Sequence, residues 1–189
     1  MKRLFIALPI PATISEVLAR QMSFLVRRLP NARVLPMENW HVTMRFLGNC
    51  NEEDVDTLGT ILQKTAQRHD APMIAVRSLR YGPPGPVARM VWAVGSSQPL
   101  IPIRETLNWM IRESKIAVEA NTWPLKLHIT LARFSRVTPI ATLPPVQEKA
   151  AVKGSIDRIM LMESFREPEG SRYECLASAH FRDREIAAQ

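Results

Sequence analysis

The chain has 189 residues, of which 46% are hydrophobic and 23% charged, a composition typical of a globular protein that excludes a disordered or fibrous one. Its apolar runs are too short to span a bilayer, so we expect no membrane contact. The formal net charge of +7 favours a polyanionic partner, with nucleic acid as the leading candidate.

The length of the chain limits the number of domains, and its cysteine content indicates the cellular compartment. A chain of this size predicts a single two-lobed domain, which we place over residues 1–185. Cys50 and Cys175 are the only cysteines, and two scattered thiols favour the reducing cytoplasm. Neither a Cys-x-x-Cys pair nor a His-Glu-x-x-His motif occurs, so we expect no metal and no other cofactor.

The chain opens with an apolar run over residues 4–8 that predicts a buried strand, and Pro9 and Pro11 end it. The next residues, Thr13-Ile14-Ser15-Glu16, have the sequence pattern of a capping box with Thr13 as the N-cap. They predict a helix that continues to about residue 28.

The strand predicted over residues 40–47 shows the cleanest alternation in the chain. Because successive side chains of a strand point to opposite faces, one face carries the apolar Trp40, Val42, Met44 and Phe46. The other face carries His41, Thr43 and Arg45.

The middle of the chain is predicted to contain both helices and strands. Asn51 is the predicted cap of a second helix over residues 52–68. Residues 73–79 and 89–94 follow as a pair of strands, and a third helix is predicted over residues 99–117.

The strand predicted over residues 127–132 repeats a pattern seen earlier in the chain. His128-Ile129-Thr130-Leu131 has the same order of His, apolar, Thr and apolar residues as His41-Val42-Thr43-Met44. Two further strands, 156–163 and 173–181, close the chain. Because several neighbouring strands are joined by short turns, we expect much of the sheet to be antiparallel and the fold class to be α+β.

The repeated His-x-Thr motif is the main candidate for chemistry. One such tetrad is common in half-buried strands, but two of them suggest a duplicated fold that brings two imidazoles to one cleft. A neutral imidazole can accept a proton while a charged one donates a proton, and a Thr hydroxyl can bind a phosphoryl oxygen. Arg45 and Arg133 are candidates for holding that phosphate. Metal ligation is the alternative, which the absence of a recurring carboxylate disfavours.

The remaining histidines and aromatic residues favour structural roles. We expect His69 and His180 to lie outside the site. Trp40, Trp92 and Trp109 lie on apolar faces and are expected in the core. Phe5 is a candidate for stacking a base at the edge of the cleft.

The residues around both motifs resemble the 2H phosphoesterase superfamily, which is named for its paired His-x-Thr motifs. Within it the chain is similar to the RNA 2′,3′-cyclic phosphodiesterases, the LigT-like family historically called 2′–5′ RNA ligases. The longest matches are residues 38–48, with the tail Arg-Phe-Leu-Gly, and residues 128–133, where Arg133 is the fifth residue after His128.

The resemblance implies a bilobal fold with a pseudo-twofold relation, in which antiparallel sheets backed by helices enclose a cleft. It implies opening of a terminal 2′,3′-cyclic phosphate to a 2′-phosphate on a tRNA-like RNA, with reversible ligation of tRNA halves. His128 would be the general base and His41 the general acid. Thr43, Thr130 and Arg133 would hold the phosphate.

Two alternatives remain open. The first keeps the enzyme class but changes the substrate to a 2′–5′ oligonucleotide or a small nucleotide cyclic phosphate. The second is a non-catalytic RNA-binding module, which the presence of both His and both Thr disfavours. We expect a monomer.

Overall fold

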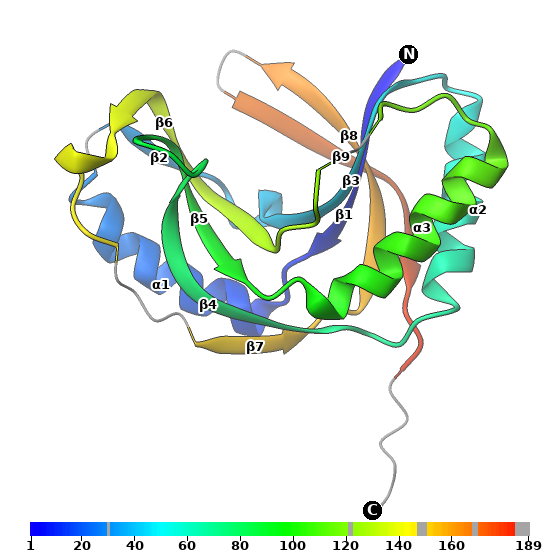
Figure 1. Cartoon of the computed structure of the whole chain (residues 1–189), viewed down its shortest axis with the longest axis horizontal. Coiled ribbons are helices and arrows are strands. Elements are labelled where there is room, and N and C mark those ends of the chain that lie inside the picture. The colour runs from blue at the N-terminus through cyan, green and yellow to red at the C-terminus, as the bar shows by residue number, and fades with distance from the viewer. Residues whose placement is uncertain (30, 121–122, 147–150, 168–169, 184–189) are drawn as a thin grey trace, which may run out of the picture.

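The computed structural model describes residues 1–29, 31–120, 123–146, 151–167 and 170–183, and within these ranges the chain forms a nine-stranded sheet and three α-helices (Figure 1). The helices are α1 (Ala12–Val26), α2 (Asp54–Ala66) and α3 (Ile101–Ser114). The strands are β1 (Lys2–Pro9), β2 (Ala32–Val34), β3 (His41–Cys50), β4 (Met73–Gly82), β5 (Val87–Gly95), β6 (His128–Pro139), β7 (Val152–Ser155), β8 (Arg158–Glu167) and β9 (Gly170–His180). Residue 185, the expected end of the domain, lies outside the described residues.

The sheet has a mirrored strand order that confirms the predicted α+β class. Its path is β7-β4-β5-β6-β3-β1-β8-β9, with β2 added to β6, and every pair of these strands is antiparallel. The two strands that begin with a motif histidine, β3 and β6, are neighbours at the centre, where Val42 pairs with Ile129. On either side, β1 next to β3 corresponds to β5 next to β6. The expected two halves therefore form one continuous sheet rather than two separate ones.

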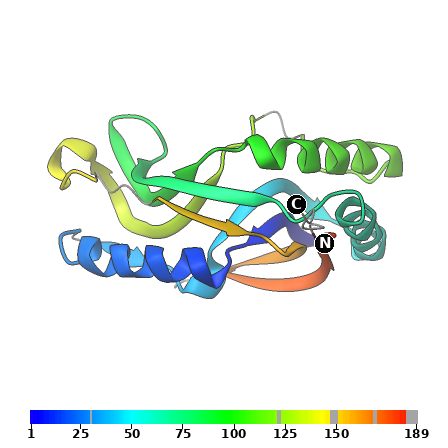
Figure 2. The same cartoon turned by 90° about the horizontal axis from the view of Figure 1, so that it is seen from below.

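The helices that follow β1 and β5 cross to the opposite half. Helix α1 packs against β7 and β2, which lie in the half of β6. Helix α3 packs against α2, and α2 packs against β8 and β9 in the half of β3. Figure 2 shows α1 and α3 at opposite ends of the molecule and on opposite sides of it. No helix within the described ranges is long and apolar enough to cross a membrane.

Both central strands carry a β-bulge at the third residue after the histidine. Between β1 and β3, Ala7 pairs with Thr43 and Ile6 with Arg45, so that Met44 is the extra residue. Between β5 and β6, Trp92 pairs with Thr130 and Val91 with Ala132, so that Leu131 is the extra residue. An extra residue inverts the alternation of the faces beyond it, because the side-chain period of a strand is two.

The bulge in β3 corrects the predicted faces of that strand. Met44 and Arg45 are both buried, and Arg45 is only 9% exposed. Phe46, which the alternation assigns to the core, is 55% exposed. The prediction that Arg45 shares a face with His41 is therefore wrong.

The predicted helix caps are also wrong, although the helices themselves are confirmed. Helix α1 begins at Ala12 directly after Pro11, and Thr13 makes no capping hydrogen bond. At α2 the backbone N–H of Asn51 donates to the carboxylate of Asp54 over 3.1 Å, the reverse of the expected role for Asn51. The short edge strand β7 was not predicted, because its four residues carry no clear alternation.

Candidate active site

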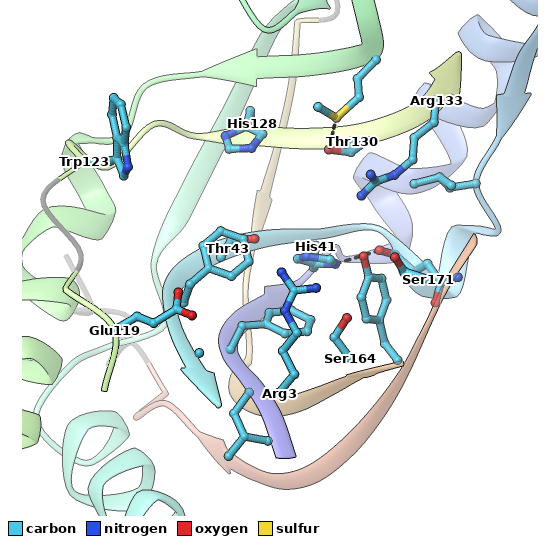
Figure 3. Close-up of a pocket in the computed structure, with 18 of the residues that line it drawn as sticks. Arg3, His41, Thr43, Glu119, Trp123, His128, Thr130, Arg133, Ser164 and Ser171 are labelled. Atoms are coloured by element: carbon cyan, nitrogen blue, oxygen red, sulfur yellow. Dashed lines mark hydrogen bonds between the residues drawn. The ribbon is translucent and has the colours of Figure 1, made fainter. Parts of the chain in front are cut away.

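A cavity of about 480 Å³ lies where the two halves of the sheet meet, and both halves line it (Figure 3). The residues from the half of β3 that matter below are Arg3, Phe5, His41, Thr43, Phe46, Ser164, Ser171 and Tyr173. Those from the half of β6 are Met90, Trp92, His128, Thr130 and Arg133. Glu119 and Trp123 come from the segment between α3 and β6. The cavity is of the size that binds small ligands in other proteins.

The two motif histidines are held in the same way. Nδ1 of His41 donates to the carbonyl oxygen of Asn39 over 2.8 Å, and Nδ1 of His128 donates to that of Lys126 over 3.0 Å. Because a carbonyl oxygen can only accept, the Nδ1 of each ring carries a proton. Each neutral ring therefore has its lone pair on Nε2, which is the nitrogen available to exchange a proton with a ligand.

Both imidazoles favour the neutral form in the free protein. Burial lowers the pKa of His41 to about 4, the hydrogen bond to Asn39 opposes this, and the charges of His128 and Arg133 add to the lowering. Burial also lowers the pKa of His128. The hydrogen bond to the carbonyl oxygen of Lys126 raises this pKa and the charge of Lys126 lowers it, and each of these effects is smaller than that of burial. A ligand with negative charge between the rings would raise both pKa values, because it stabilises the protonated form.

Aromatic rings fix the position of each imidazole. The rings of Trp92 and His128 lie 4.6 Å apart between centroids. On the other side, the rings of Phe5 and Tyr173 lie 5.1 Å and 5.3 Å from that of His41. Phe5 is only 3% exposed, so it contacts the imidazole rather than offering a free face at the edge of the cleft.

Trp92 depends on a glycine in the neighbouring strand. A methyl group on Gly82 would overlap the indole and come within 2.6 Å of its Cε2 atom. The expectation that Trp92 is a core residue is therefore wrong, because its ring lies partly exposed in the cavity against His128. Trp40 is 3% exposed and is a core residue as predicted. Trp109 is half-exposed, below the guanidinium of Arg68, and is not in the core.

The structure brings together six of the seven candidate site residues. Both threonines line the cavity on the same strands as the histidines, and Arg133 lines it beyond them on β6. Arg45 is the exception, since its side chain points to the opposite face and its Nη1 donates to Oδ1 of Asn108 on α3. Phe46 occupies the position in β3 that Arg133 occupies in β6.

Several residues of the cavity were not among the predicted site residues. Arg3 and Phe5 are two residues apart on β1, so the period of a strand could have extended the choice of Phe5 to Arg3. Ser164, Ser171 and Tyr173 come from β8 and β9, which no chemical motif marked. Among the described residues, no three His, Cys, Asp or Glu side chains converge as ligands for a metal ion.

The other two histidines lie outside the cavity, as predicted. His69 Nε2 and Thr106 Oγ1 form a hydrogen bond of 2.8 Å beside helix α3. Nδ1 of His180 lies 3.9 Å from the carboxylate of Asp157. Neither histidine lines the cavity.

Comparisons with known proteins agree with this geometry. A family model described as "LigT like Phosphoesterase" matches residues 8–92, which include the first motif. TT0787 of Thermus thermophilus has the same fold with a TM-score of 0.84 and 23% sequence identity, over 96% of this chain and 99% of that one.

Two further solved structures are similar to this chain in fold. E. coli LigT complexed with 3′-AMP superposes with a TM-score of 0.71 and 23% identity, over 96% of this chain and 99% of that chain. The MHV ns2 PDE domain superposes with a TM-score of 0.62 and 12% identity, over 85% of this chain and 99% of that domain. The resemblance in fold thus extends beyond the segment that the family model matches.

Proposed function

We propose that this chain is a LigT-like phosphoesterase of the 2H superfamily and that it hydrolyses the terminal 2′,3′-cyclic phosphate of RNA to a 2′-phosphate. The observation that carries the proposal is the pair of imidazoles in one cavity. Each comes from a different half of the sheet and has its Nδ1 hydrogen-bonded to a carbonyl oxygen. Such a pair can accept one proton and donate another across a single phosphate.

The proposed roles follow the resemblance residue by residue. His128 removes a proton from the attacking water as a new P–O bond forms. The bond from phosphorus to the 3′ oxygen breaks, and His41 donates a proton to that oxygen. Thr43 and Thr130 donate hydrogen bonds to phosphate oxygens, and Arg133 offsets the charge that develops in the transition state.

The anionic substrate itself supplies the protonation state that this mechanism needs. In the free protein both rings favour the neutral form near pH 7, because burial lowers both pKa values. One ring must become charged to act as the acid. A phosphate between the rings raises the pKa of both, so protonation and substrate binding are coupled.

The nucleotide complex of E. coli LigT and the basic charge of this chain support a nucleic-acid substrate. We extend the proposal to a tRNA-like RNA in the cytoplasm, bound by a monomer without a cofactor. Ligation of tRNA halves through a 2′–5′ bond would be the reverse reaction, in which the two histidines exchange roles.

The test is an RNA oligomer that ends in a 2′,3′-cyclic phosphate, incubated with the protein and excess chelator. We expect a 2′-phosphate as the product. His41→Ala and His128→Ala should each reduce kcat by about 10²- to 10⁴-fold, the usual contribution of a positioned acid or base. His69→Ala is the matched control, because His69 lies outside the cavity.

A 3′-phosphate product, or full activity in both variants, would refute the proposal. The alternative substrates are 2′–5′ oligonucleotides and small nucleotide cyclic phosphates. A cavity of about 480 Å³ is large enough for a mononucleotide, so the small substrate is a specific second candidate. A comparison of kcat/KM between a cyclic mononucleotide and a tRNA-sized RNA distinguishes them.

A further inference from the structure

The cavity has the carboxylate of Glu119 at one end and the guanidinium of Arg133 at the other, and the side chain of Arg3 lies between them. Figure 3 shows Glu119 and Trp123 on one side of the two histidines and Arg133 and Ser171 on the other. Glu119 is the only carboxylate among the described residues that line the cavity. On the premise that the proposed function is correct, we propose that Glu119 and Trp123 bind the nucleobase of the terminal nucleotide and select guanine.

The position of Glu119 is built into the end of β3. Its backbone N–H donates to the carbonyl oxygen of Leu47 over 2.9 Å. Its side chain crosses Gly48, which has a φ of 78°. A methyl group on Gly48 would overlap this side chain and lie 2.6 Å from Oε1. Only glycine provides both the left-handed backbone and the space at this point, so the carboxylate can lie against the chain at the edge of the cavity.

Trp123 provides an aromatic surface at the same end of the cavity as Glu119. It is 79% exposed, which is unusual for a tryptophan that contacts a cavity. Its backbone carbonyl oxygen accepts a hydrogen bond of 2.7 Å from Nη2 of Arg104 on α3. A large exposed aromatic face on a backbone held by this hydrogen bond is suited to stacking a nucleobase.

The chemistry of the two side chains determines the ligand. A carboxylate repels phosphate, so this end of the cavity suits the nucleoside, while the phosphate lies between the histidines and Arg133. An ionised carboxylate has two acceptor oxygens and no donor. Guanine presents two adjacent donors, N1–H and the N2 amino group, which can pair with both oxygens. Adenine, cytosine and uracil have no such adjacent pair of donors on their Watson–Crick edges.

The experiment compares kcat/KM for the guanosine, adenosine, cytidine and uridine 2′,3′-cyclic monophosphates. We expect guanosine to exceed the other three by about tenfold or more, the usual gain from a bidentate contact to a base. Glu119→Gln, which keeps one acceptor but adds a donor opposite N1–H or N2, should remove most of this ratio. Glu113→Gln is the matched control, because Glu113 is exposed on α3 and does not line the cavity.

Trp123→Ala tests the stacking surface separately. It should raise KM for all four nucleotides by about fivefold or more. Trp109→Ala is its control, since Trp109 is a half-exposed indole of α3 that does not line the cavity. Equal kcat/KM for the four bases, or a guanine preference that persists in Glu119→Gln, would overturn the inference and leave the proposed function intact.

A binding measurement distinguishes failure of this inference from failure of the proposed function. If none of the four nucleotides is hydrolysed, the small-substrate form of the proposed function fails. The inference can then still be tested by calorimetric titration of the wild-type protein with the 2′-monophosphates of guanosine and cytidine. Tighter binding of the guanosine compound, lost in Glu119→Gln, supports it, and equal binding refutes it.

Discussion

The fifth residue after each motif histidine faces the cavity, and it differs between the two halves. In β6 this residue is Arg133, whose guanidinium brings a positive charge to the cavity. In β3 it is Phe46, which is 55% exposed. The fourth residue after each histidine, Arg45 or Ala132, is buried instead. The two halves of the cavity are therefore related in backbone but not in chemistry.

The two arginines near the motifs should respond differently to truncation. Arg133→Ala should lower kcat/KM by an amount equivalent to about 2–4 kcal/mol, because it removes the proposed donor to the transition state. Arg45→Ala should leave kcat/KM within about twofold. It should instead reduce the free energy of unfolding by about 1–3 kcal/mol, because Asn108 loses its buried partner. Kinetics with a cyclic nucleotide and urea denaturation measure the two effects, and equal kinetic losses would contradict the assignment.

The pH dependence of kcat/KM follows from the two imidazoles. The proposed reaction needs one ring protonated and one neutral, so kcat/KM should fall when both rings are charged and when both are neutral. Because the pKa of His41 is about 4 and that of His128 lies below 6.5, the maximum of kcat/KM should lie below pH 6.5 and the rate should decline above it. The shape is the same whichever ring is the acid. A maximum of kcat/KM at or above pH 7 would contradict the burial of these rings.

At the scale of elements, two strand pairs carry the site. β1 with β3 and β5 with β6 each have a bulge at the third residue after the histidine, which turns the next residues to new faces. The alternation of hydrophobic and polar residues predicted both strands, because their first four residues follow the ideal period. It failed at Arg45 because a bulge depends on the register with a neighbouring strand, which no local pattern contains.

Gly82 at the end of β4 connects the fold to the site. Gly82→Ala should place a methyl group inside the Trp92 indole and reduce the free energy of unfolding by about 1–3 kcal/mol. It should also lower kcat, because a displaced Trp92 no longer supports His128. Gly59→Ala is the control, since a methyl group there lies 3.6 Å from Ala177 in ordinary contact, and it should stabilise α2. Thermal unfolding and steady-state kinetics of both variants check this, and a neutral Gly82→Ala would contradict it.

At the scale of the whole molecule, the mirrored sheet places two similar strands next to each other and so joins two histidines that are distant in the chain. The cavity lies at this junction and takes residues from both halves. The net charge of +7 acts over a longer range than the cavity, and on the proposed function it would attract a polyanionic RNA before any contact forms.

We therefore expect KM for a long RNA substrate to depend more strongly on salt than KM for a mononucleotide. KM for an RNA oligomer should rise several-fold between about 50 and 200 mM salt, because each phosphate bound releases counterions. KM for a cyclic mononucleotide, which carries one phosphate, should rise less. Parallel titrations of the two substrates measure the difference, and equal slopes would show that only the terminal nucleotide contacts the protein.

The sequence by itself determined the α+β class, most of the strands and helices, and the pair of His-x-Thr motifs, because these depend on local periodicity and residue type. Only the tertiary structure decided which neighbours join the motifs. It excluded Arg45 and added Phe46, because the bulges inverted the strand faces. It also brought Tyr173, Glu119 and Trp123 to the cavity from segments whose local patterns carry no chemical signal. Contacts between distant segments depend on sheet order and register, and these are properties of the whole fold.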